Sequence, residues 1–233
     1  MEENRMQNSK NHEELLWIEQ MSNRSKIYSF FAQIFMEPIP VPGEKYANTM
    51  LNNVSILVNC SENKTEGFRL LKTFYDSCLL LTAQAIQEKI AVDRTFLCRG
   101  INQAVGPVPP YESLYIKEQH DSNTIIKLLR FYQQSGFAIS KNIHERPDYI
   151  GVELSFMSEL CQREFNQIKE PQYIEIIKQK QNFYQNHLSK WIPDFCLQVV
   201  EYAKTDFFKG LAYFLIDFIK EEKKYLNKAL NQL

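Results

Sequence analysis

The chain has 233 residues, of which 44% are hydrophobic and 24% are charged, which is ordinary for a globular protein with one substantial core. Its formal net charge of −1 gives no general attraction to nucleic acid or to an anionic membrane, so neither is an expected partner. No apolar run approaches the ~20 residues of a membrane-spanning helix, and the polar start, Met1 to Met6, lacks the apolar core of a secretory signal. We therefore expect a cytoplasmic protein without stable membrane insertion.

The cysteine pattern favours reduced thiols. The number of cysteines is odd, they are widely spaced, and no two of them form a Cys-x-x-Cys pair. This pattern is typical of a cytosolic protein whose cysteines are buried as small hydrophobic side chains. The positions are Cys60, Cys78, Cys98, Cys161 and Cys196.

The N-terminal part of the chain divides into a tail and a helical stretch. Residues 1–12 are polar and are expected to be disordered, which leaves residues 13–233 for the folded domain. From Glu13 to Phe35 the apolar residues recur at helical spacing, which predicts one long helix or two. Three alternating prolines within residues 36–43 then end the helix, because such a series cannot continue it.

The next segments are also predicted to be helical. Residues 45–58 form a second amphipathic segment, and residues 61–65 are predicted to be a loop. Residues 66–92 carry the apolar stripe of a single well-buried helix, with apolar side chains three, four and seven positions apart. Residues 93–100 are predicted to lead out of that helix towards a proline-rich segment.

Two irregular joints interrupt the helical pattern in the middle of the chain. The first, residues 106–115, reads GPVPPYESLY, and the second, residues 145–151, reads ERPDYIG. Proline fixes its own φ and biases the preceding residue away from the helical region, so both joints are predicted to be extended or turning. Between them, residues 123–135 are predicted to form a helix that ends at Gly136. Such joints are where a helical protein most easily gathers recognition groups.

The remainder of the chain has helical periodicity. One helix is predicted from Ile150 onwards, another after Pro171, and a final one through Phe207 and Phe218, with a break and restart at residues 191–195. Neither a period-two strand series nor an internal repeat occurs in the sequence. We therefore predict an all-α fold, a single globular helical domain of roughly ten helices with Pro-rich interhelical joints.

Motifs of known catalytic chemistry are absent from the sequence. It contains no Walker P-loop, GxGxxG, GxSxG or HExxH pattern. The dipeptide His120-Asp121 leaves one enzymatic alternative, a helical metal-dependent phosphohydrolase, which would also need an upstream His and a distant Asp. Only His12 lies upstream, in the tail expected to be disordered, so a solvated loop pair is the simpler explanation. We expect no metal site and no cofactor.

The polar residues of the joints have simple structural explanations when each is taken alone. Glu112 and Ser113 stand where a helix is predicted to start, and both types cap free backbone N–H groups there. Asp148 precedes the next long helix and is predicted to be its N-cap. Glu145 and Arg146 are predicted to form a local ion pair, worth under ~1 kcal/mol when exposed.

Taken together and in order, four segments resemble the TorD/DmsD family of redox-enzyme maturation chaperones, to which the NarJ-type chaperones are related. They are residues 24–32 (RSKIYSFFA), residues 92–100 (VDRTFLCRG), residues 109–115 (PPYESLY) and residues 145–153 (ERPDYIGVE). The third is similar to the Pro-aromatic-Glu-Ser-x-Tyr motif of the family, and the fourth to its Glu-x-Pro-Asp-His motif. The sequence departs from the family in two places, since Tyr149 replaces the usual His and Cys98 replaces an aromatic residue.

The resemblance implies an all-helical cytoplasmic chaperone without a catalytic reaction. Its partner would be the precursor of a molybdenum-cofactor oxidoreductase, bound through the twin-arginine leader and the catalytic subunit. Such a chaperone holds the apoenzyme until the molybdopterin guanine dinucleotide cofactor is inserted, which delays export. A relative that assembles a non-exported enzyme, with no twin arginines in its client, is a further possibility. Whether the chaperone is a monomer or a homodimer stays open.

A binding site for the signal peptide follows from the resemblance and from charge. A twin-arginine peptide joins two cations to an apolar stretch, so its receptor needs carboxylates beside an apolar, aromatic-lined groove. We predict that Asp148 and Glu112 face the arginines and that Leu97, Pro110, Tyr111 and Tyr149 contact the apolar part. The full predicted signal-peptide site is Leu97, Pro110, Tyr111, Glu112, Ser113, Tyr115, Asp148 and Tyr149.

Overall fold

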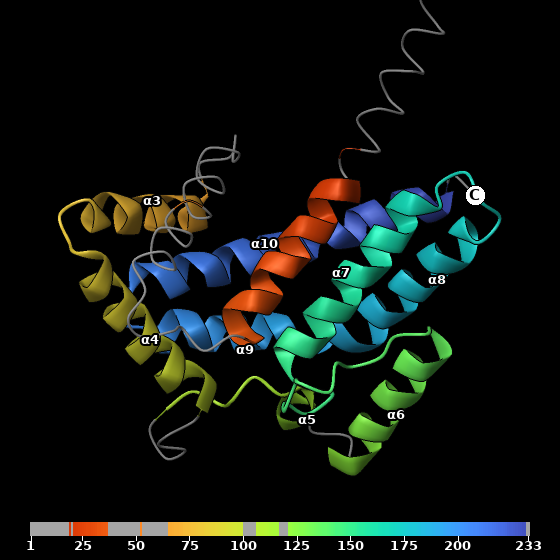
Figure 1. Cartoon of the computed structure of the whole chain (residues 1–233), viewed down its shortest axis with the longest axis horizontal. Coiled ribbons are helices and arrows are strands. Elements are labelled where there is room, and N and C mark those ends of the chain that lie inside the picture. Colours follow the sequence, from red (N-terminus) through yellow and green to blue (C-terminus); the bar gives the residue numbers. More distant parts are fainter. Residues whose placement is uncertain are drawn as a thin grey trace, which may run out of the picture.

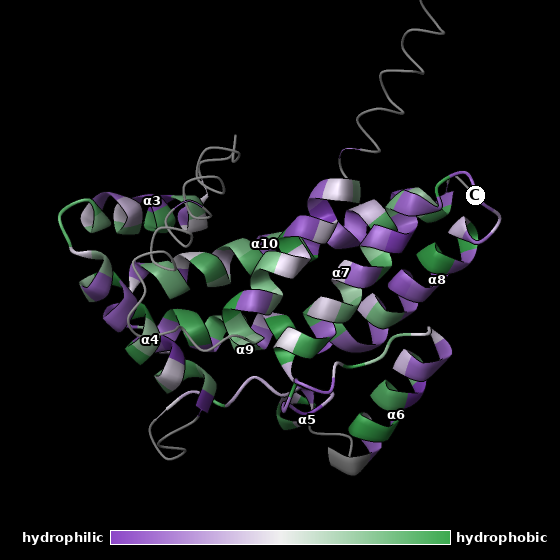
Figure 2. Ribbon diagram, viewed as in Figure 1, coloured by the Kyte–Doolittle hydropathy of each residue, from purple (hydrophilic) through white to green (hydrophobic). Residues whose placement is uncertain are grey.

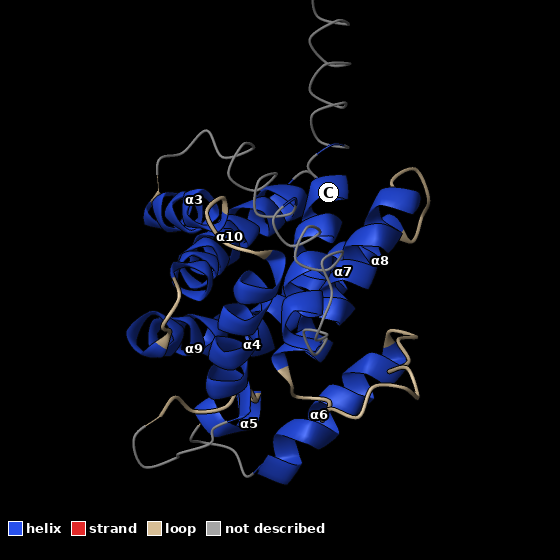
Figure 3. Ribbon diagram, turned by 60° about the vertical axis from the view of Figure 1, so that its left-hand side comes forward, coloured by secondary structure: helices blue, strands red, loops and turns tan. Residues whose placement is uncertain are grey.

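The computed structural model describes residues 19, 21–36, 52, 65–99, 106–116 and 121–231, with the side chains of residues 121 and 122 left aside. The predicted disordered tail, the prolines that follow Met36 and, apart from residue 52, the amphipathic segment after them lie outside these residues. The prediction of an all-α fold is confirmed, because the described residues form helices and loops without a strand (Figure 3).

The described helices are close in number to the roughly ten predicted. A helix covers residues 21–36, and eight labelled α-helices and one π-helical turn follow it (Figure 1). They are α3 (Glu66–Cys78), α4 (Ala83–Arg99), α5 (Glu112–Tyr115), α6 (Asp121–Gln134), α7 (Ile150–Asn166), α8 (Tyr173–Phe183), η1 (Tyr184–Leu188), α9 (Ser189–Tyr202) and α10 (Asp206–Asn231).

The C-terminal helix α10 is the element on which the others pack. It is 26 residues long and contacts α3 and α9 most extensively, and also α8 and α4. Hydrophobic residues run along α9 and the first half of α10, as the green bands of Figure 2 show. A continuous core of buried aromatic and aliphatic side chains results, including Trp191, Phe195, Phe207 and Phe208.

The crossing of α3 and α10 depends on two glycines. A Cβ atom on Gly67 would lie 2.9 Å from the carbonyl oxygen of Gly210, and one on Gly210 would lie 3.0 Å from the carbonyl oxygen of Gly67. The first distance is shorter than real Cβ atoms show, and the second is at the limit of what they show. The two backbones can therefore approach this closely only because neither residue has a side chain.

The single helix predicted over residues 66–92 is wrong, because α3 and α4 replace it. The chain turns between Cys78 and Ala83, and Leu79 and Leu80 are exposed at that turn. Thr82 starts α4, since its Oγ1 accepts a hydrogen bond from the backbone N–H of Ala85 at 3.2 Å. The run of three leucines before Thr82 hid this cap in the sequence. The exit segment predicted after Val92 is likewise helical, since α4 continues to Arg99.

The predicted break at residues 191–195 is also wrong. The structure has instead the π-helical turn η1, Tyr184–Leu188, followed without interruption by α9, which contains Pro193. Proline lacks the backbone N–H that an α-helix needs and crowds the preceding turn. The chain accommodates this with the wider π-helical turn just before α9, so the helix continues through Pro193 without a break. Gly136, in contrast, follows α6 as predicted, with a φ of 65°.

A buried charge network joins the helices on the far side of the core from α4. Lys180 of α8 is fully buried, with its Nζ 2.5 Å from Glu164 Oε2 of α7 and 3.6 Å from Glu222 Oε1 of α10. Arg24 of the first helix forms an ion pair with Glu222. Because an unpaired charge cannot be left in the interior, the network fixes these four helices relative to one another.

Candidate functional site

The two irregular joints of the chain meet in space. The N–H of Glu112 donates to the carbonyl of Asp148 at 2.9 Å, and the N–H of Ile150 donates to the carbonyl of Pro110 at 3.0 Å. These bonds make an isolated antiparallel bridge between Tyr111 and Tyr149, whose ring centroids are 5.2 Å apart. The sequence indicated two polar-aromatic joints, and the structure pairs them into one site.

Asp148 connects the joints through its side chain as well. It is fully buried, and its Oδ2 accepts a hydrogen bond from the backbone N–H of Ser113, in the first turn of α5, at 3.3 Å. The prediction that Asp148 caps the following helix is therefore wrong. The N-cap of α7 is Tyr149, whose side chain makes no capping hydrogen bond. Asp148 instead caps the short helix of the other joint, because the backbone pairing brings that helix start beside it.

Arg146 neutralises the buried carboxylate of Asp148. Its Nε lies 2.9 Å from Oδ1 and its Nη2 lies 2.7 Å from Oδ2, which is a two-pronged ion pair. The same Nη2 donates to Ser113 Oγ at 2.6 Å, and the guanidinium lies 4.9 Å from the centroid of the Tyr111 ring. The predicted local pair between Arg146 and Glu145 is wrong, since each of them has other partners.

Glu145 is held by Tyr111 and Arg99. Its Oε2 accepts a hydrogen bond from the Tyr111 hydroxyl at 2.8 Å, and its Oε1 lies 3.0 Å from Arg99 Nη1 at the end of α4. Burial and the hydrogen bond to Glu145 raise the pKa of Tyr111 to about 12, so its hydroxyl stays protonated and donates. Glu145 was not among the predicted site residues, although it opens the motif that contains Asp148.

Glu112 points into the interior, where it forms part of a buried acidic cluster. His187 of η1 lies 3.0 Å, through Nδ1, from both oxygens of Glu112. The neighbouring Glu153 accepts a hydrogen bond from Trp191 Nε1 at 3.0 Å. Burial first, and then the charge of Glu112, raise the pKa of Glu153 well above its usual range, which favours its protonated form. Sequence reasoning missed His187 and Glu153, because the pattern around each is that of an ordinary helix.

Tyr149 and α4 fasten the end of the first helix to the joints. The Tyr149 hydroxyl donates to the carbonyl of Phe35 at 2.8 Å, and Arg94 Nε donates to the carbonyl of Ile34 at 2.8 Å. Arg94 Nη2 donates to Phe35 as well. A tyrosine hydroxyl therefore stands where the family motif has a histidine, and it acts as a backbone hydrogen-bond donor. Burial raises the pKa of Tyr149 far above its ordinary value, which keeps the donor protonated.

The eight predicted site residues lie around the paired joints, but most of them are buried. Tyr111 and Tyr115 are half-buried, and Tyr115 donates its hydroxyl to the Val108 carbonyl at 2.7 Å. Leu97 lies on α4 beside Cys98, whose thiol contacts Tyr149. The buried members are Leu97, Pro110, Glu112, Ser113, Asp148 and Tyr149. That these residues bind a signal peptide stays a prediction.

An open groove runs past the second joint. It has a volume of about 1190 Å³ and is lined by the helix over residues 21–36, by α7 and by the segment that ends at Glu145. Its apolar lining includes Phe30, Met36, Phe137 and Ile143. Glu145 therefore belongs both to the paired joints and to the groove, which puts a carboxylate beside an apolar surface.

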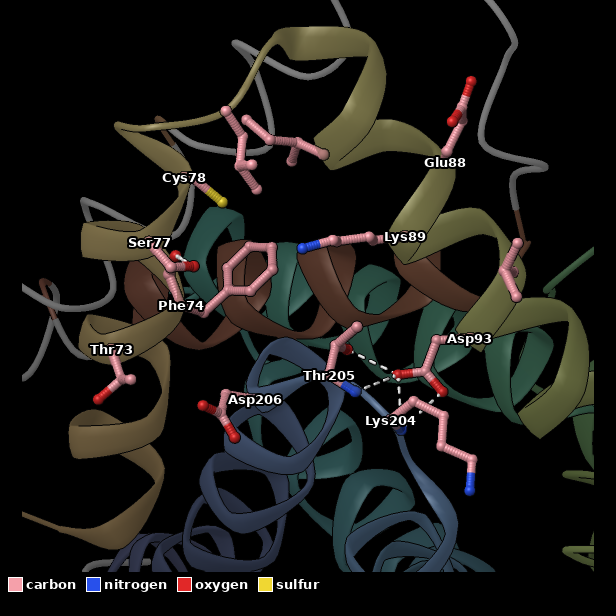
Figure 4. Close-up of a pocket in the computed structure, with 13 residues that line it drawn as sticks. Thr73, Phe74, Ser77, Cys78, Glu88, Lys89, Asp93, Lys204, Thr205 and Asp206 are labelled. Carbon is pink, nitrogen blue, oxygen red and sulfur yellow. Dashed lines mark hydrogen bonds between the residues drawn. The ribbon is translucent and has the colours of Figure 1, made fainter.

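A second cavity, of about 550 Å³, lies between α3, α4 and the start of α10 (Figure 4). Asp93 at its edge is already satisfied, because its Oδ2 accepts hydrogen bonds from the Thr205 N–H at 2.8 Å and the Thr205 hydroxyl at 2.6 Å. The carboxylate thus fixes the start of α10 to α4. This cavity shares no residue with the joints.

The described cysteines are as expected. Cys78, Cys98, Cys161 and Cys196 are free and buried, whereas Cys60 lies outside the described residues. Burial raises the pKa of Cys98 to about 11, which makes its thiol unreactive. Among the residues that the structure describes, no three His, Cys, Asp or Glu side chains are placed to hold a metal ion. None of the described helices is long and apolar enough to span a membrane.

Fold and site together define an all-helical protein whose paired joints and adjoining groove suit it to binding. A family model described as nitrate reductase delta subunit matches residues 61–197, more than half of the chain, and the chain belongs to this family. The TorD chaperone protein of Vibrio parahaemolyticus is 29% identical over 214 residues, which cover 87% of this chain and 94% of the relative.

Two assembly chaperones match shorter stretches of the chain. The chlorate reductase assembly chaperone protein of Ideonella dechloratans is 29% identical over 86 residues, covering 36% of this chain and 45% of the relative. The selenate reductase assembly chaperone protein of Thauera selenatis is 31% identical over 70 residues, covering 30% of this chain and 36% of the relative. The phosphohydrolase alternative finds no support in these similarities, and His120 lies outside the described residues.

Proposed function

We propose that the chain is a cytoplasmic, system-specific chaperone for the precursor of a molybdopterin-dependent oxidoreductase, acting without a reaction of its own. It binds the twin-arginine signal peptide of the precursor, its apo catalytic subunit, or both, and delays export until the cofactor is inserted. The observation that carries this proposal is the groove beside the paired joints, where Glu145 lies next to apolar side chains and the buried Asp148 belongs to the same joint. The names of the relatives, a TorD chaperone and two reductase assembly chaperones, support the same function.

The chemistry of the groove suits a peptide with cations next to an apolar stretch. Phe30, Met36 and Phe137 offer apolar surface to the uncharged part of such a peptide. Glu145 and Asp148 offer carboxylates to the arginines, and a bidentate arginine–carboxylate pair selects guanidinium geometry. Tyr111 contacts the surroundings of both carboxylates: its hydroxyl donates to Glu145, and the Arg146 guanidinium that binds Asp148 lies over its ring.

Burial divides the predicted site residues into two roles. Tyr111 and Tyr115 are half-buried and are proposed to touch the peptide. Asp148 is proposed to bind an arginine of the peptide in the position that Arg146 now occupies. Glu112 was predicted to face the arginines, but it is buried and paired with His187. We propose that it stabilises the shape of the first joint and does not contact the peptide. The same part is proposed for the other buried members, Leu97, Pro110, Ser113 and Tyr149.

The first experiment is capture of the client from the native cytoplasm by the tagged chain, with mass spectrometry of the retained proteins. We expect a molybdopterin-dependent oxidoreductase subunit with an uncleaved twin-arginine leader. A leaderless molybdoenzyme would keep the chaperone function but remove the arginine-binding role of the joints. Recovery of no oxidoreductase, together with metal bound to the purified chain, would overturn the proposal.

A binding assay then tests the groove. Fluorescence anisotropy with a labelled leader peptide of the captured client compares the wild type with Glu145→Gln and with the control Glu201→Gln, whose side chain is exposed on α9. We expect Glu145→Gln to weaken binding about tenfold, the loss of one charge-assisted hydrogen bond, and the control to have no effect. Equal affinity in all three proteins would remove Glu145 from the site.

A further inference from the structure

The environment of Asp148 has the parts of a complete guanidinium-binding site. Its side chain is fully buried, so its charge depends on a partner that reaches it from outside. Three groups surround the guanidinium that now occupies the site, that of Arg146. They are the carboxylate of Asp148 with its two oxygens, the hydroxyl of Ser113 at 2.6 Å from Nη2, and the Tyr111 ring, whose centroid is 4.9 Å away. A planar, forked cation satisfies all three, whereas the compact ammonium of lysine cannot.

Arg146, which occupies this site, is partly exposed to solvent. The side chain of Arg146 is 40% exposed, whereas that of Asp148 is 0% exposed. Arg146 lies only two residues before Asp148, in the loop of the second joint, so it can leave through rotation of its own side chain. The other charged groups around the joint are already paired, Glu145 with Arg99 and Glu112 with His187. Arg146 is thus the one partner of Asp148 in the described structure that water can replace without opening the core.

We infer that Arg146 is a displaceable internal ligand of this guanidinium site, and that an arginine of the client peptide takes its place on Asp148. The identity of the incoming arginine rests on the proposed function, whereas the existence of the site does not. Because the peptide competes with Arg146, only a ligand that supplies both a guanidinium and further contacts in the groove displaces it. Arg146 thereby raises the affinity that a client needs and selects arginine over lysine.

The site itself is tested by chemical rescue, with thermal unfolding as the readout. The probe is methylguanidinium chloride at low millimolar concentration, with methylammonium chloride as the matched cation. We expect methylguanidinium to raise the Tm of Arg146→Ala but not that of the wild type, and methylammonium to raise neither. The control Arg130→Ala removes an arginine that is exposed on α6 and should show no rescue. Absence of a methylguanidinium-specific rise in Arg146→Ala would overturn the inference.

Displacement is tested by binding of a twin-arginine leader peptide to the wild type, to Arg146→Ala and to Arg146→Lys. The lysine variant keeps the positive charge and serves if Arg146→Ala fails to fold. We expect each variant to bind the leader about tenfold more tightly than the wild type, since the internal competitor for Asp148 is removed or weakened. A twin-lysine version of the leader should gain nothing. Rescue by methylguanidinium without binding of the leader to any variant would keep the site and remove the proposed function. Equal leader affinity in the wild type and the variants, without rescue, would keep the function and remove the role of Arg146.

Discussion

The Asp148–Arg146 pair is asymmetric, and its variants should reflect this. Loss of Arg146 leaves a buried carboxylate without a cation, whereas loss of the Asp148 charge leaves a guanidinium that can turn to water. We expect Arg146→Ala to lower the free energy of unfolding by about 3 kcal/mol and Asp148→Asn by about 1 kcal/mol. In urea titrations the double variant should be more stable than Arg146→Ala alone. Equal losses for the two single variants would contradict this account.

Glu153 should make the stability of the protein depend on pH. Above the ordinary pKa of 4.5 the unfolded chain releases this proton, whereas the folded protein keeps it because burial and Glu112 raise the pKa. Between the ordinary pKa and the raised pKa of the folded protein, the free energy of unfolding therefore falls as the pH rises, by up to about 1.4 kcal/mol per pH unit. Glu153→Gln has an amide that can still accept the Trp191 N–H, and it removes the titrating group.

The corresponding measurement is urea unfolding of the wild type and Glu153→Gln at several pH values between about 5 and 8. The wild type should lose more stability over this range than the variant. Glu201→Gln, which removes an exposed carboxylate, should follow the wild type. A variant with the same pH slope as the wild type would show that Glu153 is already ionised in the folded protein.

For single residues, the sequence predicted which side chains lie at the joints but not which contacts those side chains make. Asp148 was expected to cap the helix that follows it, but it caps α5 instead, across 35 positions of the chain. The choice depends on the backbone pairing of the joints, which no local pattern encodes. His187 and Glu153 escaped prediction for a related reason, since a polar residue on a helix shows its burial only after the helices are packed.

Among the elements, the contact between α3 and α10 offers the sharpest test of packing. Gly67→Ala would bring a methyl group within 2.9 Å of a backbone oxygen, which cannot move without shifting a helix. We expect a loss of about 1–3 kcal/mol in the free energy of unfolding, despite the better helix propensity of alanine. Circular dichroism during urea unfolding measures it.

Gly151→Ala is the matched control for this substitution. Its new methyl group would meet Met36 Cγ at 2.4 Å, but that atom belongs to a flexible side chain that can turn away. The variant should therefore lie within about 1 kcal/mol of the wild type, because helix propensity offsets the repacking. If the two variants are equally destabilised, close backbone approach does not distinguish the two sites.

The elements were predictable where apolar periodicity was unbroken and failed where a short-range signal was hidden. The helices that became α6, α7 and α10 follow their apolar spacing, and Gly136 ends α6 as its type suggests. The α3–α4 turn was missed because leucines occupy it, and they remain exposed there. The π-helical turn before α9 was missed because no residue pattern specifies a widened turn.

On the scale of the whole molecule, the buried charge network should be sensitive to the loss of any one partner, because the remaining charges cannot reach water. Lys180→Met removes the cation shared by Glu164 and Glu222 and leaves two carboxylates in the interior. We expect a loss of about 3–5 kcal/mol in the free energy of unfolding, measured by urea titration. Adding Glu164→Gln to Lys180→Met should recover part of that loss. A double variant less stable than Lys180→Met would contradict this description.

The pairing of the joints also brings Tyr111 and Tyr149 together, so the chain between them returns to its starting point after packing α6 against the core. The intervening stretch, with α6 inside it, is a closed excursion whose two ends are fixed by backbone hydrogen bonds independent of its length. Once the ends of a loop are fixed, lengthening it costs little closure entropy. Lengthening the loop between α6 and the second joint should therefore cost little stability and leave the acidic residues of the joints in position.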